Sequence, residues 1–166
     1  TIENLKKPTI CILNGYCLGG GAELALSFDI RIGTPDCIIG FPEVSIGIIP
    51  GAGGTYRLPK TIGISNAKYW IYTAKKFNAE ESLKFGFLNF ISQKEDSIDF
   101  AVNISNDILK NAPIAIVCAK SSINEGYNKE LNEGLKIERK SYNITLNTKD
   151  RDEALDAFLN KRKPNW

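Results

Sequence analysis

The chain has 166 residues, of which 43% are hydrophobic and 24% charged, and 21 Lys and Arg stand against 19 Asp and Glu. This composition is typical of a folded globular protein, and the net charge of +2 gives no reason to expect nucleic acid or an anionic membrane as a partner. No apolar run approaches the roughly 18 residues of a membrane-spanning helix. The sequence has no histidine, which excludes Ser-His-Asp and Cys-His catalysis and most zinc sites within this chain. We therefore expect no metal, and acid–base chemistry would fall to carboxylates, lysine, tyrosine or water.

The first part of the chain predicts strands and helices in quick alternation. Residues 9–14 form a short β-branched, apolar run, and the glycines at 19–21 lead into a helix expected from about 21 to 28. Two further short strands are expected at 29–33 and 37–40, on either side of a Thr-Pro-Asp turn. This alternation predicts an α/β fold with a largely parallel sheet.

From residue 65 onward the pattern becomes mostly helical. Ser65 is placed to cap a helix whose apolar face includes Trp70. Asn78 and Glu81 have the spacing of a capping box at the start of a helix over 79–85. A short strand and further helices are expected at 88–91, near 100–109, and at 112–124, 129–143 and 150–160.

The glycine-rich α/β pattern gives way to helices alone near Asn111-Ala112-Pro113. We therefore expect two regions, residues 1–111 and residues 112–166. The four cysteines show no CxxC spacing, so we interpret them as small buried hydrophobic residues and not as a disulfide framework or a zinc site.

Two glutamates lie in glycine-rich settings and are candidate catalytic residues. Glu23 ends the run CLGGGAE, and Glu43 lies in FPEVSIGIIPGAGGT. Taken singly, such residues are most often solvated surface carboxylates. Two carboxylates presented from turns where the backbone can approach a ligand closely suit acid–base chemistry on one substrate. The bare N–H groups of the triple glycine at a helix start suit a developing oxyanion.

The other glycine-rich and basic motifs each have a structural interpretation as well as a functional one. The triple glycine alone could just permit a tight turn, and it is neither a GxGxxG dinucleotide fingerprint nor a P-loop. The run from Gly51 to Thr55 is either a plain loop or a site of close backbone approach to a ligand, with Thr55 capping the next helix. Trp70, Tyr69 and Tyr72 are expected to pack in a core. The basic tail 161–163 is either a solvated surface or a contact for a polyanion such as a coenzyme phosphate or RNA.

These motifs together resemble the crotonase family of enoyl-CoA hydratases and isomerases. The resemblance is carried by GYCLGGGAELALSFDIRIG, FPEVSIGIIPGAGGTYRLPKTIG and TKDRDEALDAFLNKRKPN, and it runs over essentially the whole chain. The segments IIPGAGGT, RLPKTIG and TKDR are also similar to the branch that binds AU-rich RNA and hydrates 3-methylglutaconyl-CoA.

The resemblance implies a spiral of strand-strand-helix turns followed by a helical C-terminal region that builds trimers, often paired into hexamers. It implies that Gly20 donates an oxyanion-hole N–H to the thioester carbonyl and that Glu23 and Glu43 are the catalytic carboxylates, as base and acid. Isomerases of this family generally keep one of the two, so both together favour a hydratase, a hydro-lyase that adds water to a trans-2-enoyl-CoA. The alternatives are a 3-methylglutaconyl-CoA hydratase that also binds RNA, and an enoyl-CoA isomerase. No cofactor is implied, because the substrate itself carries coenzyme A.

Members of this family run to roughly 250 residues, the size of a large single domain. We therefore expect this chain to be a C-terminal fragment, without the first strands and the second oxyanion N–H, and to be inactive alone. The implied role is fatty-acid β-oxidation, in mitochondria for a eukaryotic protein and otherwise in the cytoplasm.

Overall fold

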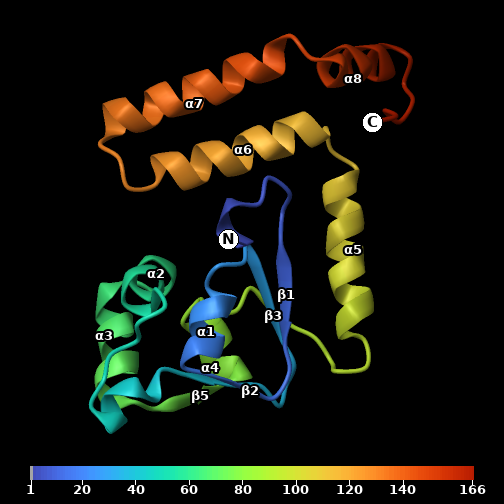
Figure 1. Cartoon of the computed structure of the whole chain (residues 1–166). Helices are drawn as coiled ribbons and strands as arrows, with labels where there is room; N and C mark the ends of the chain where they lie inside the picture. Colours follow the sequence, from blue (N-terminus) through green and yellow to red (C-terminus); the bar gives the residue numbers. More distant parts are fainter. Residues whose placement is uncertain (1) are drawn as a thin grey trace. The chain divides into compact units, whose positions relative to one another are not determined.

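The computed structural model describes residues 2–166, and the chain forms two compact units (Figure 1). The first unit comprises residues 2–4 and 9–103, and the second comprises Leu5–Pro8 and Ile104–Trp166. The division between these units falls within one helix, α5 (Ser97–Leu109). The region boundary expected at residues 111–112 stays a prediction.

The first unit contains two three-stranded sheets, and the chain passes back and forth between them. One sheet has the order β1 (Ile10–Leu13), β3 (Ile30–Gly33), β6 (Phe90–Ile91), all parallel. The other has the order β2 (Tyr16–Leu18), β4 (Ile38–Gly40), β5 (Lys76–Asn78), with β5 antiparallel to β4. The first two passages each add one strand to each sheet before helices follow, and in the third α4 (Ala79–Lys84) lies between β5 and β6. This repeated alternation of strands and helices confirms the expected spiral of strand-strand-helix turns.

Helices complete both units. Those of the first unit are η1 (Ile2–Asn4), α1 (Gly20–Ala25), η2 (Pro42–Ile46), α2 (Gly54–Ile62), α3 (Ile64–Thr73) and α4 (Ala79–Lys84). After α5 the second unit has α6 (Pro113–Gly126), α7 (Leu131–Leu146) and α8 (Lys149–Leu159). The two long helices α6 and α7 lie side by side and antiparallel (Figure 1). No helix in residues 2–166 is long and apolar enough to span a membrane.

An aromatic cluster fills the core of the first unit. The Trp70 ring is fully buried and stacks on Phe77 at 4.1 Å between centroids and on Phe87 at 5.6 Å, with Phe41 at 6.5 Å. Trp70 is therefore a core residue, as expected. Tyr72 is not, because 71% of its surface is exposed. Tyr69 is partly exposed, but its ring packs edge-on against Phe77 at 5.8 Å between centroids.

The structure contains one of the three helix caps that the sequence predicts. The capping box of α4 is confirmed: Asn78 Oδ1 accepts the Glu81 N–H at 2.9 Å, and Glu81 Oε2 accepts the Asn78 N–H at 3.0 Å. The predicted caps at Ser65 and Thr55 are wrong, because both residues lie inside their helices. These helices start at Ile64 and Gly54, and their N-caps are Gly63 and Gly53, glycines with positive φ that turn the chain.

Candidate active site

Glu23 is held in place by the loop that leads into α2. Its residue is 3% exposed, and its Oε1 accepts the N–H groups of Ala52 and Gly54, each at 2.7 Å. Position 54 has room only for glycine, since a Cβ there would lie 3.0 Å from Glu23 Oε1 and 2.8 Å from Pro50 Cβ. Both hydrogen bonds go to Oε1, so Oε2 is not engaged by this loop.

Glu43 has a different environment. It lies in the 3-10 helix η2, directly after Pro42, which starts that helix. Both of its carboxylate oxygens are buried, and within residues 2–166 neither has a hydrogen-bond partner. Burial of a carboxylate without a partner costs free energy, and native proteins rarely keep such a group unless it has a function.

Gly19 contacts both glutamates, Glu43 through its carboxylate and Glu23 through its backbone N–H. A Cβ on Gly19 would lie 3.2 Å from Glu43 Oε1, so Glu43 packs directly against this residue. Gly19 is also the N-cap of α1, and its carbonyl accepts the Glu23 N–H at 2.9 Å. With φ of 54°, Gly19 adopts a left-handed conformation that suits glycine, and its N–H donates to the Gly40 carbonyl. The structure therefore brings Glu43 to the N-cap residue of α1, the helix that carries Glu23.

Gly20 is the first residue of α1 and is exposed. The N–H groups of a first helical turn have no acceptor within the helix. Space is open beside Gly20. Apart from its chain neighbours and its own helix, no heavy atom of residues 2–166 lies within 4 Å of the position that a Cβ on Gly20 would take. An acceptor atom of a ligand can thus approach the Gly20 backbone.

Arg57 and Glu3 are the site residues that sequence reasoning missed. Arg57 on α2 donates from Nη1 to the Ala52 carbonyl at 3.2 Å, and from Nε and Nη2 to the two Glu3 oxygens at 3.1 and 2.8 Å. The contacts with Glu3 join residues more than fifty positions apart and follow no local pattern. The one available signal was the glycine-rich run 51–55, interpreted either as a plain loop or as a site of close backbone approach to a ligand. In the structure its Ala52 and Gly54 amides bind the carboxylate of Glu23.

The cysteines supply no nucleophile near these residues. All four are free thiols, and burial raises the pKa of Cys11 and Cys37 to about 11 and that of Cys17 to about 12. The thiols of Cys11, Cys17 and Cys37 therefore stay protonated at neutral pH and lack the reactive thiolate. Within residues 2–166, no group of three or more His, Cys, Asp or Glu side chains is arranged to hold a metal ion.

Comparison with known proteins gives the family. The whole chain, residues 1–166, matches the family model described as enoyl-CoA hydratase/isomerase. The chain belongs to this family. It is 40% identical over 162 residues to the short-chain-enoyl-CoA hydratase of Clostridium acetobutylicum, covering 98% of this chain and 62% of that protein. It is likewise 40% identical over 169 residues to the mitochondrial methylglutaconyl-CoA hydratase of Mus musculus, covering 99% of this chain and 54% of that protein.

The fold agrees with solved members of the enoyl-CoA hydratase/isomerase family. The crystal structure of an enoyl-CoA hydratase from Bacillus anthracis superposes with a TM-score of 0.97 at 41% identity, over 99% of this chain and 64% of that one. The chain thus spans about three fifths of the length of the relatives that it matches.

Proposed function

We propose that the full-length gene product is an enoyl-CoA hydratase that adds water reversibly to a trans-2-enoyl-CoA. The observation that supports this most strongly is the pair of buried carboxylates, on two glutamates that both contact Gly19. One of them, Glu23, is fixed by two backbone N–H groups, whereas Glu43 has no protein partner in residues 2–166. This asymmetry suits two groups that hold one water and exchange protons with it.

In the proposed reaction, the thioester carbonyl oxygen accepts a hydrogen bond from the Gly20 N–H at the start of α1. The negative charge that develops on this oxygen is stabilised there, and one such donor is typically worth about 3 kcal/mol of barrier. A second donor would come from residues outside 1–166.

The two glutamates carry the proton transfers. The oxygen of a water held between them bonds to C3 while Glu23 takes a proton from that water. The electron pair of the C2–C3 double bond moves toward the thioester, and Glu43 gives a proton to C2. A proton passing from Glu23 to Glu43 then restores both groups, so the net change is the addition of one water. The two groups are coupled, so this division of roles belongs to the pair.

Within this proposal, the alternatives differ mainly in the acyl group of the substrate. The equal identity to a short-chain and to a methylglutaconyl-CoA hydratase favours neither substrate. Having both glutamates favours hydration over isomerisation.

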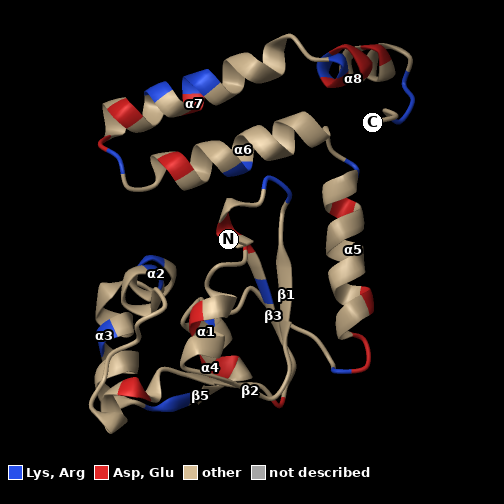
Figure 2. Ribbon diagram, viewed as in Figure 1, with Lys and Arg blue, Asp and Glu red and all other residues tan. Residues whose placement is uncertain are grey.

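The structure of the basic tail argues against RNA binding, because the Arg162 guanidinium already binds Glu153 and Asp156. Figure 2 shows acidic and basic residues mixed along α8.

A substrate panel on the full-length gene product tests the proposal. Crotonyl-CoA, 3-methylglutaconyl-CoA and a 3-enoyl-CoA would be compared by following the conjugated enoyl thioester and the 3-hydroxyacyl product. We expect hydration of a 2-enoyl-CoA at a higher kcat/KM than conversion of the 3-enoyl isomer. Faster conversion of the 3-enoyl-CoA would make the protein an isomerase, and no turnover of any of the three would overturn the proposal.

We also propose that the protein assembles as a homotrimer through its C-terminal helices. Leu155, Phe158 and Leu159 recur at three- and four-residue spacing on α8, so they share one face, and Phe158 is 82% exposed. Contiguous apolar patches on a protein surface mark interaction sites when they are large, which supports α8 as a contact surface.

A further inference from the structure

The loop that holds Glu23 is itself held by Arg57. The Nη1 group of Arg57 donates to the carbonyl of Ala52, whose own N–H donates to Glu23 Oε1. The Arg57 N–H also donates to the Gly53 carbonyl at 2.8 Å, so backbone and side chain of one residue both bind this loop. Gly53 lies between the two residues whose amides bind Glu23, Ala52 and Gly54.

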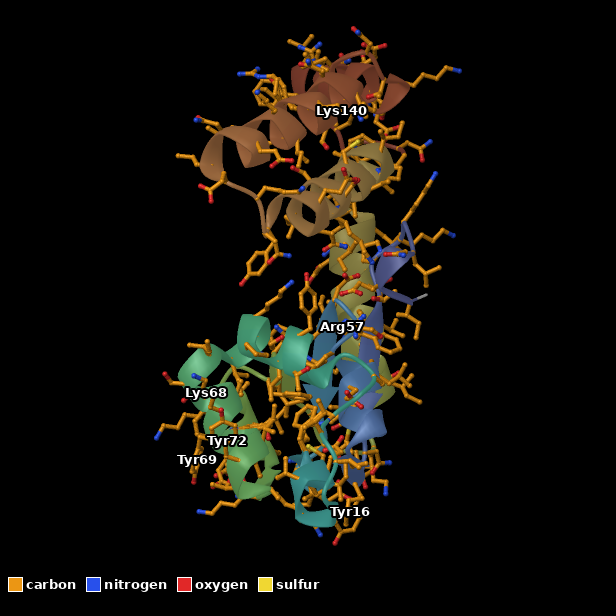
Figure 3. All side chains as sticks on the ribbon, turned by 60° about the vertical axis from the view of Figure 1, so that its left-hand side comes forward. Tyr16, Arg57, Lys68, Tyr69, Tyr72 and Lys140 are labelled. Atoms are coloured by element: carbon orange, nitrogen blue, oxygen red, sulfur yellow. The ribbon has the colours of Figure 1, made fainter. Side chains whose placement is uncertain are left out.

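The guanidinium packs directly on Gly53. A Cβ at Gly53 would lie 1.9 Å from Arg57 Nη1. Gly53 also has a φ of 109°, a backbone conformation that residues other than glycine rarely adopt. The guanidinium can therefore lie here only because position 53 has no side chain. Figure 3 labels Arg57 on the first unit.

Glu3 fixes the orientation of the guanidinium. Its two oxygens accept from Nε and Nη2, a bidentate arrangement that only arginine can make. The pKa of Arg57 is raised, mainly by this hydrogen bond and further by the charges of Glu3 and Glu23. Arg57 is thus close enough to Glu23 for their charges to interact, although it makes no hydrogen bond to that carboxylate.

We propose that Arg57 is a positioning residue for Glu23, which it orients by holding the Ala52–Gly54 loop while the Glu3 carboxylate anchors its guanidinium. This inference rests on the proposed function, because it assigns Arg57 a part in presenting the base. A small displacement of the two amides would move Glu23 Oε1 and with it the water that Glu23 holds. Misplacement of a reacting group by about 1 Å typically costs about a hundredfold in rate.

The test uses kcat and KM for crotonyl-CoA in the full-length gene product. Arg57→Gln should lower kcat by about ten- to a hundredfold with little change in KM, because the loop does not bind substrate in this account. Glu3→Gln should act in the same direction by a smaller factor, and it also serves if Arg57→Gln fails to fold. In a Glu23→Gln background, Arg57→Gln should cause no further loss, because its effect passes through Glu23.

The matched control is Lys68→Gln, which also removes one positive charge. Lys68 is exposed on α3, and Figure 3 shows it on the outer side of that helix and apart from Arg57. It should leave kcat and KM unchanged. A folded Arg57→Gln or Glu3→Gln enzyme with wild-type kcat, or a full extra loss in the Glu23→Gln background, would overturn the inference.

A second readout separates this inference from the proposed function. Amide hydrogen exchange at Ala52 and Gly54 should be faster in Arg57→Gln than in the wild-type and Lys68→Gln proteins, since both amides depend on the clamped loop for their bonds to Glu23. If the wild-type protein hydrates no enoyl-CoA, the proposed function fails and amide exchange alone decides the role of Arg57. Unchanged exchange at both amides would overturn that role.

Discussion

The ion pair between Glu3 and Arg57 ties the start of the first unit to α2. The pKa of the Glu3 carboxyl is held below its ordinary value of 4.5, chiefly by the hydrogen bond from Arg57. A carboxyl whose folded-state pKa is lowered stabilises the native state above its unfolded pKa, and this contribution is lost as the pH falls through the lower, folded value. The pair therefore contributes at neutral pH and not in acid.

This linkage predicts how Glu3→Gln changes stability with pH. The free energy of unfolding of the wild-type protein should exceed that of Glu3→Gln at about pH 7, and the difference should narrow toward about pH 3 as Glu3 becomes protonated. Urea unfolding of both proteins at the two pH values measures it. An equal difference at both pH values would show that the charge on Glu3 contributes nothing.

At the scale of elements, patterns between residues close in sequence could be predicted, whereas contacts between distant residues could not. The capping box of α4 involves residues three apart, so its spacing was visible. Strands β2 and β5 were missed because Tyr-Cys-Leu and Lys-Phe-Asn contain no β-branched residue, unlike the equally short β4 with Ile38 and Ile39. Pairing with β4 defines both strands. The two glutamates could be singled out by their glycine-rich settings, but the bonds from Ala52 and Gly54 could not, since they join residues about thirty apart.

The capping box gives an element-scale prediction. Asn78→Ala should lower the free energy of unfolding by about 1 kcal/mol, because the Glu81 N–H loses its acceptor at the start of α4. Glu80→Gln, in the same first turn, should change it by less than about 0.5 kcal/mol. Chemical denaturation of the two variants makes the comparison, and equal effects would mean that the cap does not stabilise α4.

At the scale of the whole molecule, the exposed apolar face of α8 predicts how copies associate. Phe158→Glu should convert the proposed trimer of the full-length gene product to monomers, because a charge would then be buried at the contact. Lys163→Glu adds an acidic residue nearby but off this face, and the trimer should persist. Light scattering coupled to gel filtration measures the mass; a monomeric wild-type protein, or a trimer unaffected by Phe158→Glu, would contradict the assembly.

The account as a whole rests on proton exchange by Glu23 and Glu43. Glutamine keeps the volume and hydrogen-bonding capacity of each side chain but cannot exchange a proton in this way. A positioned acid or base typically contributes about a hundred- to ten-thousandfold in rate. Because both groups act on one water, removal of the second should add little to removal of the first.

The most direct measurement is kcat for crotonyl-CoA hydration by the full-length gene product and its Glu23→Gln, Glu43→Gln and double variants. Glu80→Gln, an exposed glutamate on α4, serves as the matched control. We predict a loss of at least about a hundredfold in each single variant, a double variant scarcely worse than the poorer single one, and wild-type kcat for Glu80→Gln. Near wild-type kcat in both single variants would show that these glutamates are structural, and the proposed hydratase mechanism would be wrong.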